Sequence, residues 1–234
     1  FEPSMVGVRG SFMASNMERL AAEYAPAKTK FTQLRDDLAQ RLRAGDGGFQ
    51  TLDDWIALNE VIGDSEATLA WIDRIKDRPG ADRTFNRAWF RINRLLVEKE
   101  RYELYGKIAP DPVRDARRNL ARLNDGFLPP TMDEDQRRQF MEMQSQRVID
   151  ELATLHASLL LANREQEATE IADELFAKLA GCDARIAVAS KAMELGVVTK
   201  RHLAWLDECP AKQEINDLRD QIEKHLMEQK RGGR

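Results

Sequence analysis

The sequence is poor in the residues that mark several common classes of protein. Its 234 residues include two Cys, 8 Pro and 13 Gly, and the cysteines match neither a zinc site nor a CxxC redox motif. So little proline and glycine, with 42% hydrophobic and 32% charged residues, excludes a disordered chain and disfavours an all-β one. No apolar run approaches the roughly 20 residues that a membrane-spanning helix needs. These absences favour a soluble, helical protein.

Motifs of catalysis and cofactor binding are also missing. HExxH and GxSxG do not occur, and the glycine-rich stretch 45–48 lacks the lysine and the preceding strand of a phosphate-binding loop. The histidines His156, His202 and His225 lie on different expected helices, without another metal ligand at a suitable spacing. His156, between two leucines, is expected to pack in the core with its hydrogen bonds satisfied. We therefore expect no catalytic residue, no metal and no cofactor; the alternative is an enzyme site assembled from several helices.

The two cysteines are placed at the ends of neighbouring expected helices. If residues 183–195 and 199–208 form an antiparallel hairpin, Cys182 and Cys209 lie at its open end. Helix axes pack about 8–10 Å apart, whereas a disulfide needs Cα atoms within about 7 Å. Two free thiols are therefore favoured, and a bond would indicate an oxidising compartment.

Hydrophobic periodicity predicts helices along the whole chain and no strand. Glycine and proline mark most of their ends, as at Gly63, Gly196 and Pro110. The segment 133–162 is expected to form one helix, or two that break near Ser145. Nine of the expected helices have definite bounds: 13–24, 28–44, 52–62, 113–124, 133–162, 165–179, 183–195, 199–208 and 211–228. Three more are expected between them: one capped at Asp64 or Ser65 that stops at 78–80, one that carries the apolar stripe from Phe85 to Leu96, and one with Tyr102 and Tyr105 that ends at 109–112.

The chain also contains signs of an internal repeat. The pentapeptide LAWID at residues 69–73 returns 134 residues later, at 203–207, as LAWLD. This separation is close to four times a period of roughly 34 residues. Turn signals recur at intervals of 34, 66 and 33 residues, near Gly63, Val97, Asn163 and Gly196. The interval of 66 residues is twice the 33-residue period. It therefore predicts a further turn at its middle, near position 130, where Pro129 and Pro130 interrupt the helical pattern.

A helical hairpin with this period resembles the tetratricopeptide repeat. The best match is the turn ANREQEA at 162–168, and the apolar positions after it are Ile171, Ala172, Leu175 and Phe176. The segment APDP at 109–112 resembles the proline-containing end of a repeat. The first helix of each unit lacks the Trp-Leu-Gly-Tyr pattern of that family, and residues 13–48 and 133–162 depart from it. The resemblance implies an all-α fold, an irregular α-α superhelix of antiparallel helical hairpins.

One domain is expected overall, with four segments. Residues 1–12 are expected to be a flexible tail or a vector-derived linker, and 13–48 a pair of helices. Hairpins are expected over 49–210, followed by a capping helix and tail at 211–234. Trp71 and Trp205 take equivalent positions in the repeat and are expected in the core, not as binding platforms.

Charge is unevenly distributed along the chain. The net charge is −4, yet residues 76–122 contain 13 Lys or Arg against 7 Asp or Glu, a balance of +6. One expected helix of this segment carries an apolar stripe from Phe85 to Leu96. Basic side chains recur on its opposite face, and two asparagines lie nearby. The candidate ligand-binding residues are Arg83, Arg87, Arg91, Arg94, Asn86 and Asn93. In a tetratricopeptide-like hairpin such a face often lines the concave groove, where arginines hold carboxylates or phosphates with two hydrogen bonds.

We expect a non-catalytic scaffold that binds a peptide or a partner protein, preferably an acidic one, in a helical groove. Three alternatives remain: nucleic-acid binding through residues 76–122, a structural subunit of a larger assembly, and a merely solvated charged face. Nucleic acid is disfavoured because the rest of the chain is acidic and no recognised motif occurs. The expected location is the cytoplasm; a sequence that starts at Phe1 leaves the periplasm and secretion open, and the oligomeric state is not indicated.

Overall fold

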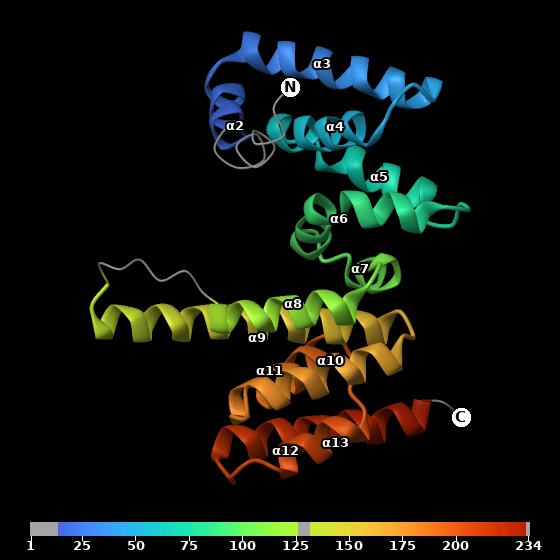
Figure 1. The fold of residues 1–234 in the computed structure, drawn as a ribbon. Coiled ribbons are helices and arrows are strands. Elements are labelled where there is room, and N and C mark those ends of the chain that lie inside the picture. The colour runs from blue at the N-terminus through green and yellow to red at the C-terminus, as the bar shows by residue number, and fades with distance from the viewer. Residues whose placement is uncertain (1–13, 126–131, 233–234) are drawn as a thin grey trace. The chain divides into compact units, whose positions relative to one another are not determined.

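The computed structural model describes residues 14–125 and 132–232, which belong to two compact units (Figure 1). The N-terminal unit ends at Glu100 and the C-terminal unit starts at Arg101. The described residues form twelve helices and no strand, which confirms the all-α class. None of these helices has the length and the apolar composition to cross a bilayer. The division into segments 13–48, 49–210 and 211–234 stays a prediction.

The N-terminal unit is built around helix α4. Its core consists of apolar side chains of α4, α5 and α6, including Ile56, Ile72, Phe85 and Ile92. Helices α2, α3, α5 and α6 all pack against α4. The five helices are α2 (Ala14–Glu23), α3 (Ala25–Ala44), α4 (Phe49–Ile62), α5 (Ser65–Ile75) and α6 (Ala81–Glu98).

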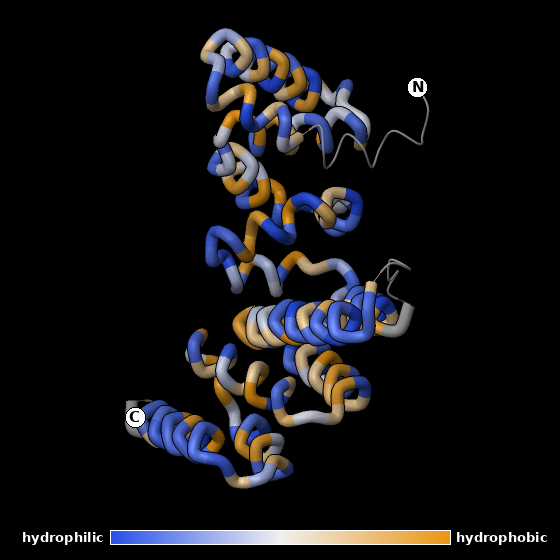
Figure 2. Tube along the Cα trace, turned by 90° about the vertical axis from the view of Figure 1, so that its left-hand side faces the viewer, coloured by the Kyte–Doolittle hydropathy of each residue, from blue (hydrophilic) through white to orange (hydrophobic). Residues whose placement is uncertain are grey.

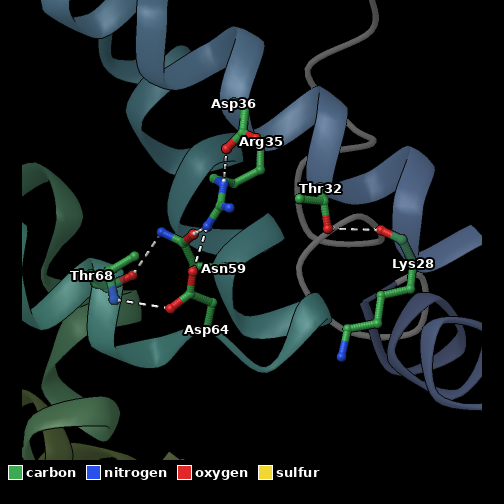
Figure 3. A network of polar contacts seen from close by, with 8 residues as sticks. Lys28, Thr32, Arg35, Asp36, Asn59, Asp64 and Thr68 are labelled. Atoms are coloured by element: carbon green, nitrogen blue, oxygen red, sulfur yellow. Dashed lines mark hydrogen bonds and ion pairs between the residues drawn. The ribbon is translucent and has the colours of Figure 1, made fainter.

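A polar network joins α3, α4 and α5 (Figure 3). Arg35 on α3 donates from Nη1 to Asp64 Oδ2 at 2.6 Å and to Asn59 Oδ1 at 3.0 Å. Asn59 is fully buried and donates in turn to Thr68 Oγ1 at 3.1 Å. Asp64 also caps α5, since it accepts from the backbone N–H of Ala67. The buried amide is therefore satisfied on both sides, and the network fixes how these helices meet.

The C-terminal unit is built around α9, a single helix of 28 residues without a break at Ser145. A capping box between Asp133 and Gln136 starts α9, and α7, α8, α10 and α11 pack against it. The final helix, mostly hydrophilic in Figure 2, buries Ile215, Leu218 and Ile222. The helices are α7 (Tyr102–Ile108), α8 (Pro112–Asp125), α9 (Glu134–Leu161), α10 (Glu165–Lys178), α11 (Cys182–Glu194), α12 (Lys200–Asp207) and α13 (Gln213–Gly232).

Helices α7 and α9 approach each other at Gly106. A Cβ on Gly106 would overlap the backbone carbonyl of Ser158 on α9. The same region is held by Arg164, whose Nη1 donates to the carbonyl oxygens of Gly106 at 2.7 Å and Ala109 at 2.8 Å. One guanidinium therefore satisfies two carbonyls at the end of α7, which the helix itself leaves without partners.

Cys182 and Cys209 form a disulfide bond, so the expectation of two free thiols is wrong. The distance between helix axes does not apply to these residues, because Cys182 starts α11 and Cys209 follows the end of α12. At this open end the Cα atoms are 5.8 Å apart, within the range of a disulfide.

The turns of the structure depart from an even period. Positive φ values mark turns at Gly63, Asn163 and Gly196, as expected. The turn expected near Val97 falls at Glu100, because α6 continues to Glu98. The intervals between these turns are thus 37, 63 and 33 residues, and the turn expected near position 130 lies outside the described residues.

Candidate functional site

Helix α6 separates its side chains into a buried stripe and an exposed stripe. Phe85, Ala88, Ile92 and Leu96 are buried in the N-terminal unit. The opposite side, here called the outer face of α6, consists of Arg83, Arg87, Phe90 and Arg94, all of them exposed. At about 100° per residue, this face is centred roughly opposite the buried stripe.

Phe90 is the most unusual member of the outer face, with 81% of its surface exposed. A scattered apolar residue on a protein surface needs no explanation. Phe90, however, lies three residues after Arg87 and four before Arg94, so its ring is placed between guanidinium groups on one side of the helix. The sequence analysis missed this residue, although its position about 160° from the centre of the buried stripe was a usable signal.

The four predicted arginines differ in how far their charges are compensated. Arg83 and Arg87 are exposed and form no ion pair with any residue that the structure describes. Arg94 is 71% exposed and pairs with Glu60 at 3.1 Å and Glu98 at 2.8 Å. Free positive charge on the outer face therefore lies at Arg83 and Arg87.

Arg91 has a different environment from the other three. Its side chain is 10% exposed, and its Nε and Nη2 donate to the two carboxylate oxygens of Asp53 on α4 at 2.6 and 3.2 Å. This two-bond geometry is the strong form of an arginine–carboxylate pair. Arg91 thus joins α6 to α4, and its donors on that side are not available to a ligand.

The two asparagines flank the outer face. Asn86 is exposed, whereas Asn93 is half-buried and its Oδ1 accepts from the backbone N–H of Arg94 at 2.6 Å. Of the six predicted site residues, the structure therefore leaves Arg83, Arg87 and Asn86 without a hydrogen-bond or ion-pair partner among the described residues, and brings Phe90 between the arginines.

The wider basic segment 76–122 is divided between the two units at Glu100. Ion pairs with described residues engage at least these basic residues of the segment: Lys76, Arg91, Arg94, Lys99, Arg114, Arg117 and Arg118. Much of the positive charge counted in the sequence is therefore compensated locally.

A second cluster of functional side chains lies inside the C-terminal unit. His156 on α9 and His202 on α12 are both buried, with their Nε2 atoms 3.1 Å apart. His156 Nδ1 bonds to the carbonyl of Ala168 at 2.8 Å, which confirms the expectation of a satisfied core histidine. His202 Nδ1 accepts from the backbone N–H of Thr199 at 3.0 Å. Sequence reasoning did not pair these histidines, because 46 residues separate them.

The environment of this pair disfavours the charged imidazole. Burial lowers the pKa of His156 to about 4, and burial together with His156 lowers the pKa of His202 to about 3. The ring of Trp205 packs edge-on against both imidazoles and against Phe176. Both histidines are therefore neutral at pH 7.

Comparison with known proteins adds no relative: no family model, no curated protein and no solved structure matches this chain.

Proposed function

We propose that the protein is a non-catalytic interaction module that binds an acidic segment of a partner protein along the outer face of α6. The observation that carries this proposal is an 81% exposed phenylalanine beside two arginines that have no ion pair among the described residues. Aromatic and arginine side chains are the residues most enriched at the centres of protein interfaces.

The spacing of the side chains along the outer face of α6 defines the kind of segment that would bind there. Arg83, Arg87 and Phe90 cover two turns of α6, about 10 Å along its axis at 1.5 Å per residue. A partner that places an apolar side chain on Phe90 and carboxylates within reach of Arg83 and Arg87 would bury the ring and form charge-assisted hydrogen bonds. An amphipathic helix with acidic residues one turn from an apolar one has this arrangement.

The architecture and the location of this module also belong to the proposal. Turns at Gly63, Asn163 and Gly196 and antiparallel neighbours such as α11 and α12 support a tetratricopeptide-like solenoid of helical hairpins. The Cys182–Cys209 bond supports an oxidising compartment rather than the cytoplasm.

Peptide selection against the full chain tests the function. We expect a random peptide library to yield sequences that combine Asp or Glu with a large apolar residue. The double variant Arg83→Glu/Arg87→Glu should weaken the best peptide by about 100-fold or more, since each lost charged hydrogen bond is worth about 1.5–3 kcal/mol. Phe90→Ala should weaken it by about tenfold. Fluorescence anisotropy with a labelled peptide measures both effects.

A matched control is available in the same unit. Arg43→Glu/Arg74→Glu changes two exposed arginines and alters the net charge by the same amount, so the peptide should bind it as it binds the wild type. Selection of basic peptides, or equal affinity for the Arg83→Glu/Arg87→Glu variant, would refute the proposal.

A further inference from the structure

The contacts of His156 and His202 fix the position of every imidazole proton in the pair. The carbonyl of Ala168 can only accept, so His156 carries its proton on Nδ1 and presents a lone pair at Nε2. The backbone N–H of Thr199 can only donate, so His202 has its lone pair on Nδ1 and its proton on Nε2. His202 Nε2–H therefore donates to His156 Nε2. One chain of three hydrogen bonds runs from α12 through both rings to α10.

An additional proton cannot enter this chain without breaking it. On His156 it would occupy Nε2 and face the N–H of His202. On His202 it would occupy Nδ1 and face the N–H of Thr199, the first residue of the capping box of α12. The one acceptor near Nδ1 that the contacts show is the Thr199 hydroxyl, at 3.1 Å, which already accepts from the backbone N–H of Arg201. Either site places two donors against each other in a buried position, where the loss of a hydrogen bond is costly.

The groups around the pair offer little compensation for a positive charge. From α12, the cation Arg201 opposes protonation of His156, and its Nη1 donates to Thr169 on α10. On α11, the guanidinium of Arg185 lies 4.7 Å from the centre of the Phe176 ring. The same guanidinium forms an ion pair with Glu208, which follows α12. The ring of Trp205 packs against both imidazoles, Phe176 packs behind Trp205, and the Ala168 carbonyl accepts from His156.

Helix α12 depends on these contacts. It has eight residues, well below the roughly 12–15 that an isolated helix needs for marginal stability. Its buried side chains are His202, Trp205 and Leu206. The first two belong to the cluster, and Leu206 packs with apolar side chains of α11 and α13. At its other end the disulfide from Cys209 to Cys182 ties it to α11.

We propose that the His156–His202 contact is an acid-sensitive latch: mild acidification releases α12 from α9 and α10, while the Cys182–Cys209 bond keeps the released helix attached to α11. The latch lies in the C-terminal unit and is independent of the function proposed for the outer face of α6.

The pH window follows from the docked and released states. A released imidazole takes up a proton below about pH 6.5, whereas the docked rings stay neutral until pH falls to about 4 and 3. The docked state therefore loses stability as pH falls from about 6.5 to 4. Each histidine multiplies the opening constant by up to about tenfold per pH unit, so the pair gives up to about 100-fold per unit.

Hydrogen exchange of the full, disulfide-bonded chain tests the latch. The opening constant of peptides that cover α12 is measured by mass spectrometry from pH 7.0 to 5.0, after correction for the intrinsic pH dependence of exchange. In the wild type it should rise by at least tenfold between pH 6 and 5, while peptides from α4 show no such rise. His202→Gln keeps a capping-box side chain that does not titrate and should reduce the slope, and His156→Gln/His202→Gln should remove it.

His225→Gln is the matched control, since His225 on α13 lies outside the pair and contacts Gln229; it should keep the wild-type slope. An equal slope in the double variant, or an equal rise in the α4 peptides, would overturn the latch. If the double variant does not fold, NMR titration of the wild-type imidazoles decides: rings that titrate near pH 6.5 while α12 stays protected would contradict the proposal.

Discussion

At the scale of single residues, Gly106 accepts no side chain larger than hydrogen, because α7 meets the backbone of α9 there. An alanine would push its methyl group into the carbonyl of Ser158, and neither backbone can move without disturbing the two hydrogen bonds from Arg164. The position thus determines how closely the two helices pack.

We expect Gly106→Ala to lower the free energy of unfolding by about 3 kcal/mol or more, as overpacking against a rigid neighbour does. Urea denaturation followed by circular dichroism measures the change. Gly181→Ala is the control: an added Cβ there meets nothing within 4 Å, so it should cost only about 1 kcal/mol, the loss expected when alanine replaces a good N-cap residue. Similar stabilities for the two variants would show that α7 and α9 can separate freely.

Residue identities predicted part of the candidate site. Helical periodicity correctly separated Arg83 and Arg87 from the buried Phe85. It could not predict the burial of Arg91, which lies at the edge of the exposed stripe, because its environment is decided by Asp53, 38 residues earlier in the chain. The histidine pair was inaccessible for the same reason, since it depends on how α9 and α12 pack.

At the scale of helices, local signals predicted most boundaries. Glycines with positive φ end α4 at Gly63 and follow α11 at Gly196. The turn after α6 was predicted three residues too early, near Val97, because Glu100 adopts a positive φ of 52°, a conformation that a glutamate does not signal. The disulfide was missed because it joins helix termini, for which the distance between axes is a poor guide.

Removal of that disulfide should destabilise the C-terminal unit. The bond closes a loop over a sequence separation of 27, for which loop-closure entropy gives about 3–4 kcal/mol. We expect Cys182→Ser/Cys209→Ser to show this loss in urea denaturation. A thiol reductant should destabilise the wild type by the same amount and leave the double variant unaffected; a wild type insensitive to reductant would contradict this estimate.

At the scale of the whole molecule, each unit has a core of its own. Ile92 is fully buried in the N-terminal unit and Leu175 in the C-terminal one. Cores that share few side chains can unfold separately, so the chain need not behave as a two-state system.

We therefore expect two unfolding transitions that respond to different substitutions. Ile92→Ala should lower only the stability of the N-terminal unit, and Leu175→Ala only that of the C-terminal unit, each by about 2–5 kcal/mol. Hydrogen exchange of peptides from each unit in urea distinguishes them. A single transition lowered for all peptides by either substitution would mean that the units fold as one.

The Cys182–Cys209 bond also limits how far the chain can be stretched. Between these residues lies a length of chain that would reach about 90 Å if fully extended. Because the bond closes this loop covalently, a force pulling on the two ends of the polypeptide bypasses α12 and cannot draw the loop out. The helix that the latch would release is therefore shielded from mechanical tension, so pH can act on it while load does not.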